Sequence, residues 1–326
     1  GPPPRQHARE LLEGNWDPEA ATYEQEALVD WPVMLTGSVG GLLKLWNAEE
    51  DPDMDALEGH TDCVTCLAVD WKARLALSGS GDRSIRLWDL HRLTCLKAWA
   101  HAGWIWCLAF RWNDRRALSA SDDRTVCLWD LDQEACLKQF DISEGWVLSM
   151  ATDWASQRTL VGYCNSKLEL RGLAHWELIG TFTGHSAAVQ NIAADWASCR
   201  AISASSDHTL RLWDVERMEC IHTFEGHAGP VRCVVFNWDA GFALSGSEDK
   251  TLRLWNLKDR VCSKSISGHE DEVRSVAVNW RSMKALSGSL DGTLRRWSLV
   301  RAACVSMVEQ GDGAVSFSAP GFECSA

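Results

Sequence analysis

Hydrophobic and polar residues along this chain are grouped into short runs, without the 3.6-residue period of amphipathic helices. Runs such as Val231–Trp238 (VRCVVFNW) and Thr251–Leu257 (TLRLWNL) are rich in β-branched and aromatic residues. Gly, Ser and Asp residues separate one run from the next. Short apolar runs bounded by turn residues are typical of β-strands. The pattern therefore predicts an all-β protein built from short strands.

These strands recur with a fixed period. Three series of residues each repeat at intervals of 41 or 42, with one interval of 84 where a unit lacks the residue in the first and third series. The first series is Trp46, Trp88, Trp129, Trp213, Trp255 and Trp297; the second is Trp71, Trp112, Trp154, Trp196, Trp238 and Trp280; the third is His60, His101, His185, His227 and His269. Each unit holds four strand-like runs, and a repeat of this length with four strands is typical of a propeller blade. The period predicts seven blades.

Within the units, the pattern GH…(V/I)xxxxxxW…SxSxDxTLRLWD resembles the WD40 repeat over roughly residues 28–310. The resemblance implies a seven-bladed WD40 β-propeller with four antiparallel strands per blade. It also implies a hydrogen-bonded set in each blade, in which Trp donates to Ser, Ser meets the His ring, and Asp orients the His. The matching sets are His60, Ser78, Asp82 and Trp88; His101, Ser119, Asp123 and Trp129; His185, Ser203, Asp207 and Trp213; His227, Ser245, Asp249 and Trp255; and His269, Ser287, Asp291 and Trp297.

Ser, His and Asp together also suggest a catalytic triad, but a triad is needed only once and beside an open cleft. Five copies on a strict period favour a structural role. The fourth blade, near residues 142–183, is degenerate and has Ser143, Val161, Asn165 and Arg171 at the four places. Losing the whole set avoids leaving single buried polar groups unpaired, each at about 1–3 kcal/mol. We expect Glu169 and Arg171 to be solvated there.

The chain is expected to comprise an N-terminal arm (1–20), the propeller (21–319) and a C-terminal tail (320–326). The first blade is partial, since it keeps Thr36 and Trp46 but lacks the His and has Gly40 in the Asp place. Two segments compete for its inner strand, Tyr23–Val29 (YEQEALV) and Gly311–Ala319 (GDGAVSFSA). We favour Tyr23–Val29, with the tail packed nearby.

The net charge of −13 argues against nucleic acid or an anionic membrane as partner, because both attract basic surfaces. No window has the roughly 18 apolar residues of a membrane helix, and the first residues are polar. Five of the thirteen cysteines recur with the repeat, about one blade apart and too far for disulfides: Cys95, Cys136, Cys220, Cys262 and Cys304. We predict reduced core cysteines, no metal site, no cofactor and a cytoplasmic location, with the nucleus as the alternative.

The second tryptophan series lies between the first and second strands of each unit. Its periodicity favours packing of each indole against the neighbouring blade. The alternative is an aromatic ring that binds a ligand on one face, and burial distinguishes the two.

Residues outside the periodic sets are the candidates for binding. The segments that follow the His positions carry Trp104, Trp106 and Trp146 in blades three and four, and Arg232 and Arg274 in blades six and seven. Trp and Arg dominate interface hot spots, so these residues suit a short peptide with an apolar anchor and an acidic group. The alternative is that the tryptophans fill space between blades.

The sequence therefore predicts a non-catalytic scaffold that binds proteins or peptides, acting as a monomeric propeller within a complex. The alternative is a substrate-recognition or regulatory subunit of a larger assembly such as a ubiquitin ligase. The family's WDxR signature for one such role is absent after Trp88, Trp129 and Trp213. Catalysis in the central channel would require carboxylates or histidines there outside the periodic set.

Overall fold

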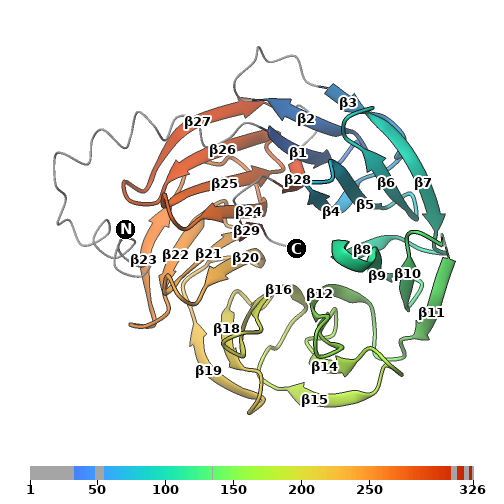
Figure 1. Cartoon of the computed structure of the whole chain (residues 1–326). Helices are drawn as coiled ribbons and strands as arrows, with labels where there is room; N and C mark the ends of the chain where they lie inside the picture. The colour runs from blue at the N-terminus through green and yellow to red at the C-terminus, as the bar shows by residue number, and fades with distance from the viewer. Residues whose placement is uncertain (1–32, 48–54, 134, 310–313, 319–322, 325–326) are drawn as a thin grey trace.

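Seven β-sheets form a ring around a central channel (Figure 1). They are seen in a computed structural model that describes residues 33–47, 55–133, 135–309, 314–318 and 323–324. Each sheet has four antiparallel strands in order from the channel to the rim, and the last sheet has a fifth. The seven-bladed propeller predicted by the repeat is therefore confirmed.

The blades follow one another along the chain. Blade one contains β28 (Ala314–Ser318), β1 (Val33–Ser38), β2 (Leu43–Asn47) and β3 (Asp55–Leu57). Blade two contains β4 (Val64–Asp70), β5 (Leu75–Ser80), β6 (Ser84–Asp89) and β7 (Thr94–Ala100), and blade three contains β8 (Ile105–Arg111), β9 (Arg116–Ser121), β10 (Thr125–Asp130) and β11 (Ala135–Asp141). Blade four contains β12 (Val147–Asp153), β13 (Arg158–Tyr163), β14 (Leu168–Gly172) and β15 (Leu178–Phe182).

The remaining blades repeat this order. Blade five contains β16 (Val189–Asp195), β17 (Arg200–Ser205), β18 (Leu210–Asp214) and β19 (Glu219–Phe224), and blade six contains β20 (Val231–Asn237), β21 (Phe242–Ser247), β22 (Leu252–Asn256) and β23 (Val261–Ile266). Blade seven contains β24 (Val273–Asn279), β25 (Lys284–Ser289), β26 (Thr293–Ser298) and β27 (Ala303–Glu309), together with the short β29 (Glu323–Cys324) beside β24.

The core lies between blades rather than in a single centre. The second strand of a blade is covered on both faces by its neighbours, so all six residues of β21 (FALSGS) are buried. Small residues are needed where blades approach closely. A Cβ on Gly79 would lie 2.6 Å from Ile105 of the next blade and 2.7 Å from the Cys66 sulfur. The outermost strands, such as β11, are largely exposed.

The C-terminal segment closes the ring, which corrects our preference for Tyr23–Val29. Strand β28 pairs with β1 in antiparallel register, for example Leu35 with Ser318, and so occupies the inner position of blade one. It contacts β24 of blade seven and β4 of blade two. Residues 23–29 lie outside the described part of the chain. The sequence pattern of residues 311–319 indicated the inner strand of blade one correctly, because it repeats the start of a blade.

The periodic cysteines are not core residues, contrary to our expectation. The twelve cysteines from Cys63 to Cys304 are free. Cys66, Cys107, Cys127 and Cys233 are buried as expected, but Cys136, Cys220 and Cys304 are exposed on the outermost strands. In three blades an arginine of the third strand donates to the cysteine sulfur, as Arg86 does to Cys95 at 3.8 Å. All five periodic thiols share a contact with the backbone carbonyl two residues on, as Cys95 donates to Lys97 at 3.2 Å.

Candidate functional site

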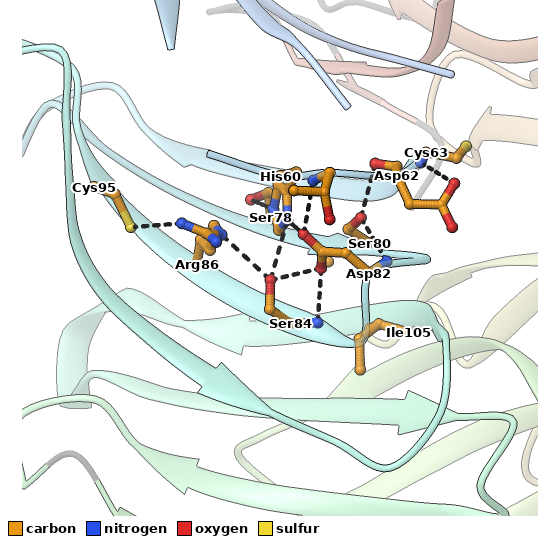
Figure 2. Close-up of polar contacts among 12 residues, drawn as sticks. His60, Asp62, Cys63, Ser78, Ser80, Asp82, Ser84, Arg86, Cys95 and Ile105 are labelled. Carbon is orange, nitrogen blue, oxygen red and sulfur yellow. Dashed lines mark hydrogen bonds and ion pairs between the residues drawn. The ribbon is translucent and has the colours of Figure 1, made fainter. Parts of the chain in front are cut away.

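Five blades contain a buried hydrogen-bonded set of His, Ser, Asp and Trp. In blade two the His60 Nδ1 lies 2.8 Å from Asp82, and its Nε2 lies 2.7 Å from the Ser78 hydroxyl. The indole N–H of Trp88 donates to the same hydroxyl at 2.7 Å. Figure 2 shows His60 together with Ser78 and Asp82 in blade two. Blades three, five, six and seven repeat the arrangement.

The electrostatics of this set fix its protonation. Burial lowers the pKa of His60, against the opposing effect of Asp82, and so favours the neutral ring. Partial burial alone would raise the pKa of Asp82, but hydrogen bonds from Ser84 and His60 outweigh it and lower the pKa to about 2. A neutral His with its proton on Nδ1 donates to the carboxylate and accepts from Ser78 at Nε2. Every polar atom of the set is then satisfied.

The local sequence explains why the Asp sits at a turn. The Asp82 carboxylate also accepts from the backbone N–H of Ser84 and of Thr61, which ties the turn to the loop after His60. Arg83, which lies between Asp82 and Ser84 in this turn, adopts a positive φ of 72°. The glycine of the Gly-His pair has a similar role. Gly226 has φ of 152°, and a Cβ there would lie 2.9 Å from Arg253.

The Ser-His-Asp sets are not arranged for nucleophilic catalysis. The serine hydroxyl is fully buried in each set and already accepts from an indole N–H. A catalytic serine needs access to a substrate carbonyl beside an oxyanion hole. The geometry instead joins the second and third strands of one blade, the turn between them and the loop that precedes the blade.

Blade four replaces this set with an ion pair. Glu169 is only 3% exposed, and Arg171 donates to its carboxylate at 2.7 and 2.9 Å and to the Trp176 carbonyl at 3.0 Å. Our expectation that Glu169 and Arg171 are solvated is therefore wrong, because Arg171 occupies the buried place of the Trp. Burial, reinforced by the Glu169 carboxylate, raises the pKa of the adjacent Tyr163.

Blade one retains part of the set. The Trp46 indole N–H donates to the Thr36 hydroxyl at 2.9 Å, which reproduces the Trp–Ser contact of the other blades. The exposed turn after Ser38 takes the place of the Asp turn.

The second tryptophan series packs between blades. Trp280 is buried, and the other five members are half-buried. Arg158 of blade four lies over Trp196 of blade five at 5.3 Å, and Arg200 of blade five over Trp238 of blade six at 5.6 Å. This burial favours packing against the neighbouring blade over a ring that binds a ligand.

The central channel contains an apolar cavity of about 460 Å³ bounded by the inner strands of blades three to six. Its larger lining side chains are Leu108, Phe110, Met150, Trp154, Ile192, Trp196 and Phe236. No carboxylate or histidine lines it. Among the described residues, no group of three or more His, Cys, Asp or Glu side chains could hold a metal ion.

The candidate tryptophans lie on the face that carries the Asp turns. The Trp104 and Trp146 carbonyls accept from the backbone N–H of Asp122 and Cys164, in the turns of their own blades. Trp104 is 38% exposed and Trp146 46% exposed. Trp106 is half-buried and lies beside Trp104, with ring centroids 5.8 Å apart and planes inclined by 38°. We call Trp104, Trp106 and Trp146 the aromatic patch.

The two candidate arginines have partners within their own blades. Arg232 forms an ion pair with Glu248, and Arg274 forms one with Glu272 at 2.7 Å. All four side chains are partly exposed. The acidic group that we predicted in a ligand would therefore compete with an internal carboxylate at each arginine.

Asp62 and Asp122 are residues at this site that the sequence interpretation did not single out. The Trp104 backbone N–H donates to the Asp122 carboxylate at 2.7 Å. Asp62 comes two residues after His60, and its carboxylate points away from the His60 set in Figure 2. Blades three to six have Gly103, Gly145, Ala187 and Gly229 at the place of Asp62, whereas blade seven has Asp271, so an acidic residue occurs there in two blades.

A ring of seven four-stranded sheets with five buried His-Ser-Asp-Trp sets defines a repeat propeller. The family model described as "WD domain, G-beta repeat" matches residues 53–89, 93–130, 176–214, 218–256 and 260–298. These segments make up more than half of the chain. The protein belongs to the WD40-repeat family.

Curated relatives match only short parts of the chain. It is 37% identical over 60 residues to eukaryotic translation initiation factor 3 subunit I of Xenopus laevis, covering 18% of each chain. It is 42% identical over 55 residues to the probable E3 ubiquitin ligase complex SCF subunit sconB of Emericella nidulans, covering 17% of this chain and 8% of that protein. The matches thus span less than a fifth of these relatives' length.

Among solved structures, the computationally designed Ika8 protein has a similar fold. Its TM-score is 0.67 at 19% sequence identity, over 87% of this chain and 86% of that one. This likeness concerns the fold alone. No helix in the described ranges has the length and apolar character that crossing a bilayer requires.

Proposed function

We propose that this chain is a non-catalytic interaction scaffold that binds partner proteins or peptides on the face bearing the Asp turns. The observation that carries the proposal is the exposure of Trp104 and Trp146 on that face, beside Trp106. Exposed indoles are costly in water and are enriched at binding hot spots. The recurring polar sets are buried and satisfied, which leaves the non-periodic residues to contact a partner.

Absence of a catalytic arrangement is part of the proposal. The Ser-His-Asp sets are closed off by Trp, and the channel cavity has an apolar lining without acid or base. A cytoplasmic location, with the nucleus as the alternative, accords with free cysteines at the surface.

The test is affinity purification of partners on the wild-type chain and on the Trp104→Ala/Trp106→Ala variant. We expect the variant to lose the main partner while its free energy of unfolding stays within about 2 kcal/mol of the wild type. The matched control is Leu178→Ala/Ile179→Ala, which removes two exposed apolar side chains from the rim strand β15. This control should retain the partner.

Because Trp106 is half-buried, a second variant separates binding from folding. Trp104→Ala/Trp146→Ala removes only the two exposed indoles. If this folded variant retains every partner of the wild type, the aromatic patch is not the binding site and the proposal fails.

The alternative is a substrate-recognition or regulatory subunit of a larger assembly. It is favoured by the partial likeness to proteins named as subunits of a ubiquitin ligase complex and of a translation initiation factor. Size-exclusion chromatography of the purified partners distinguishes the two, since a subunit elutes in a complex of fixed composition.

A further inference from the structure

The exposed residue Trp104 lies close to two carboxylates, one at its backbone and one near its ring. Asp122 accepts a hydrogen bond from the Trp104 backbone at 2.7 Å. On the other side, Asp62 of blade two and the Trp104 ring lie 2.9 and 3.3 Å from the point where a Gly81 side chain would begin. Neither Asp62 nor Asp122 forms an ion pair with a described residue. This part of the face is therefore aromatic and negatively charged.

Gly81 is buried and allows Asp62 and the Trp104 ring to pack closely against it. The same position in the turns of blades three to seven carries a side chain: Asp122, Cys164, Ser206, Glu248 and Leu290. Only blade two among these six blades has glycine there. A methyl group at this point would contact both Asp62 and the Trp104 ring.

The charge distribution across the channel mouth favours a cationic ligand. Arg232 and Arg274 are already neutralised by Glu248 and Glu272. An acidic ligand must displace one of these carboxylates, whereas a cation meets Asp62 and Asp122 without displacing a charge. This is the opposite sign from the acidic ligand group that the arginines suggested in the sequence.

Indole faces attract cations directly. A Lys ammonium or Arg guanidinium within about 6 Å of a Trp centroid is attracted by the negative face of the ring, more strongly when water is excluded. Trp104 and Trp106, inclined at 38° with centroids 5.8 Å apart, offer two such faces at one place. A neighbouring carboxylate adds a charge-assisted hydrogen bond.

We propose that Trp104, Asp62 and Asp122 form a subsite for a lysine or arginine side chain in a basic segment of a partner protein. The proposal rests on the interaction function stated above and specifies its ligand. The cation lies against the exposed part of the Trp104 ring, where Gly81 lets the Asp62 carboxylate approach that ring closely. The aliphatic stem of the side chain packs on the aromatic patch, as long cationic side chains do on apolar surfaces.

The experiment begins with a random peptide library selected on the purified full chain, with Trp104→Ala as the counter-selection. The best peptide is then titrated by calorimetry, together with versions in which its Lys or Arg becomes norleucine or Glu. We expect enriched peptides to share a Lys or Arg, and norleucine to weaken binding about tenfold, equivalent to about 1.4 kcal/mol. Added salt should also weaken binding.

Three variants test the protein side. Asp62→Asn/Asp122→Asn keeps the shape of both side chains and should weaken binding of the Lys or Arg peptide about tenfold, with little effect on the norleucine peptide. Gly81→Ala should weaken binding of both peptides, because the added methyl group pushes Asp62 and the Trp104 ring apart. Leu178→Ala on the rim should bind both like the wild type, and denaturant unfolding of each variant checks the fold.

The outcomes separate this inference from the proposed function. If enriched peptides are acidic or apolar and still lose binding with Trp104→Ala, the cation subsite is wrong and the interaction face stands. The subsite is also wrong if the paired Asn variant binds the basic peptide as tightly as the wild type. If no peptide prefers the wild type over Trp104→Ala, both proposals fail.

Discussion

Blades four and five have the same four strands but are stabilised by different polar chemistry. In blade five His185, Ser203, Asp207 and Trp213 form one connected set with distances of 2.6 to 2.8 Å. In blade four an ion pair between Glu169 and Arg171 occupies the places where blade five has Arg211 and Trp213. Both blades keep the small residues and apolar strands that pack against neighbours.

The comparison shows that a blade can form with a polar core other than the His-Ser-Asp-Trp set. Blade four has no intermediate arrangement, such as a Ser without its Trp. A half-complete set leaves a buried donor or acceptor unpaired at about 1–3 kcal/mol unless another group pairs with it, as the Lys44 carbonyl does with Thr36 in blade one. The blade therefore differs from its neighbours at every position of the set together.

The largest effect is expected from removing the cation of blade four. Arg171→Ala leaves the buried Glu169 carboxylate without its partner, so we expect a loss of about 3–5 kcal/mol in the free energy of unfolding. Chemical denaturation measures it. Glu169→Leu/Arg171→Met should recover most of the loss, since an apolar pair of similar volume leaves no charge. A loss below about 1 kcal/mol for Arg171→Ala would show that Glu169 is solvated.

An intermediate loss in the free energy of unfolding is expected when the Ser hydroxyl is removed from blade five or a hydroxyl is added to blade four. Ser203→Ala in blade five leaves the Trp213 N–H and the His185 Nε2 without a partner, at about 1–3 kcal/mol each. Val161→Ser in blade four should also destabilise, because the added hydroxyl has no Trp or His beside it. Denaturation of both variants tests this. A serine that stabilises blade four would contradict the interpretation.

The smallest expected effect is a pH dependence of the free energy of unfolding. It comes from the buried histidines of the polar sets, which blade four lacks. Burial lowers the pKa of His60, His227 and His269 below the ordinary 6.5. The unfolded chain then binds protons first as pH falls, so this contribution is complete above pH of about 6.5 and is lost on acidification. The carboxylates act in the same direction at lower pH, because the pKa of Asp82 and of Asp291 is lowered to about 2.

His227→Gln tests the histidine contribution. We expect its free energy of unfolding to fall less steeply than that of the wild type between about pH 7 and pH 5, whatever its value at neutral pH. The control is Ser143→Gln, at the corresponding place of blade four, which should leave the slope unchanged. Equal slopes for His227→Gln and the wild type would show that this histidine titrates as in the unfolded chain.

The fold was predictable because the repeat appears in three independent series of residues. Six of the seven inner strands follow from the position of the apolar run after each His place. The seventh was assigned to the wrong end of the chain, because both termini resemble an inner strand. Pairing with β1, which decides the matter, is a long-range contact that no local pattern contains.

The sequence indicated which residues form the candidate site but not the contacts that they make. The exposed tryptophans were found because they depart from the period, but the partners of Arg232 and Arg274 were not. Glu248 immediately precedes the motif residue Asp249, so its turn position was readable while its contact was not. Likewise, Glu169 and Arg171 are two residues apart and share one face of β14, which makes an ion pair possible in sequence terms.

The place of β28 late in the sequence determines when the ring can close during synthesis of the chain. The strands β1, β2 and β3 are synthesised before those of blades two to seven. Their sheet nevertheless lacks its innermost strand until residues 314–318 emerge, after β4 to β27. Until then, blade one lacks the strand that contacts blades two and seven, so the nascent propeller cannot close into a ring. Any premature stop before these residues yields a product that cannot join its own ends, however well its middle has folded.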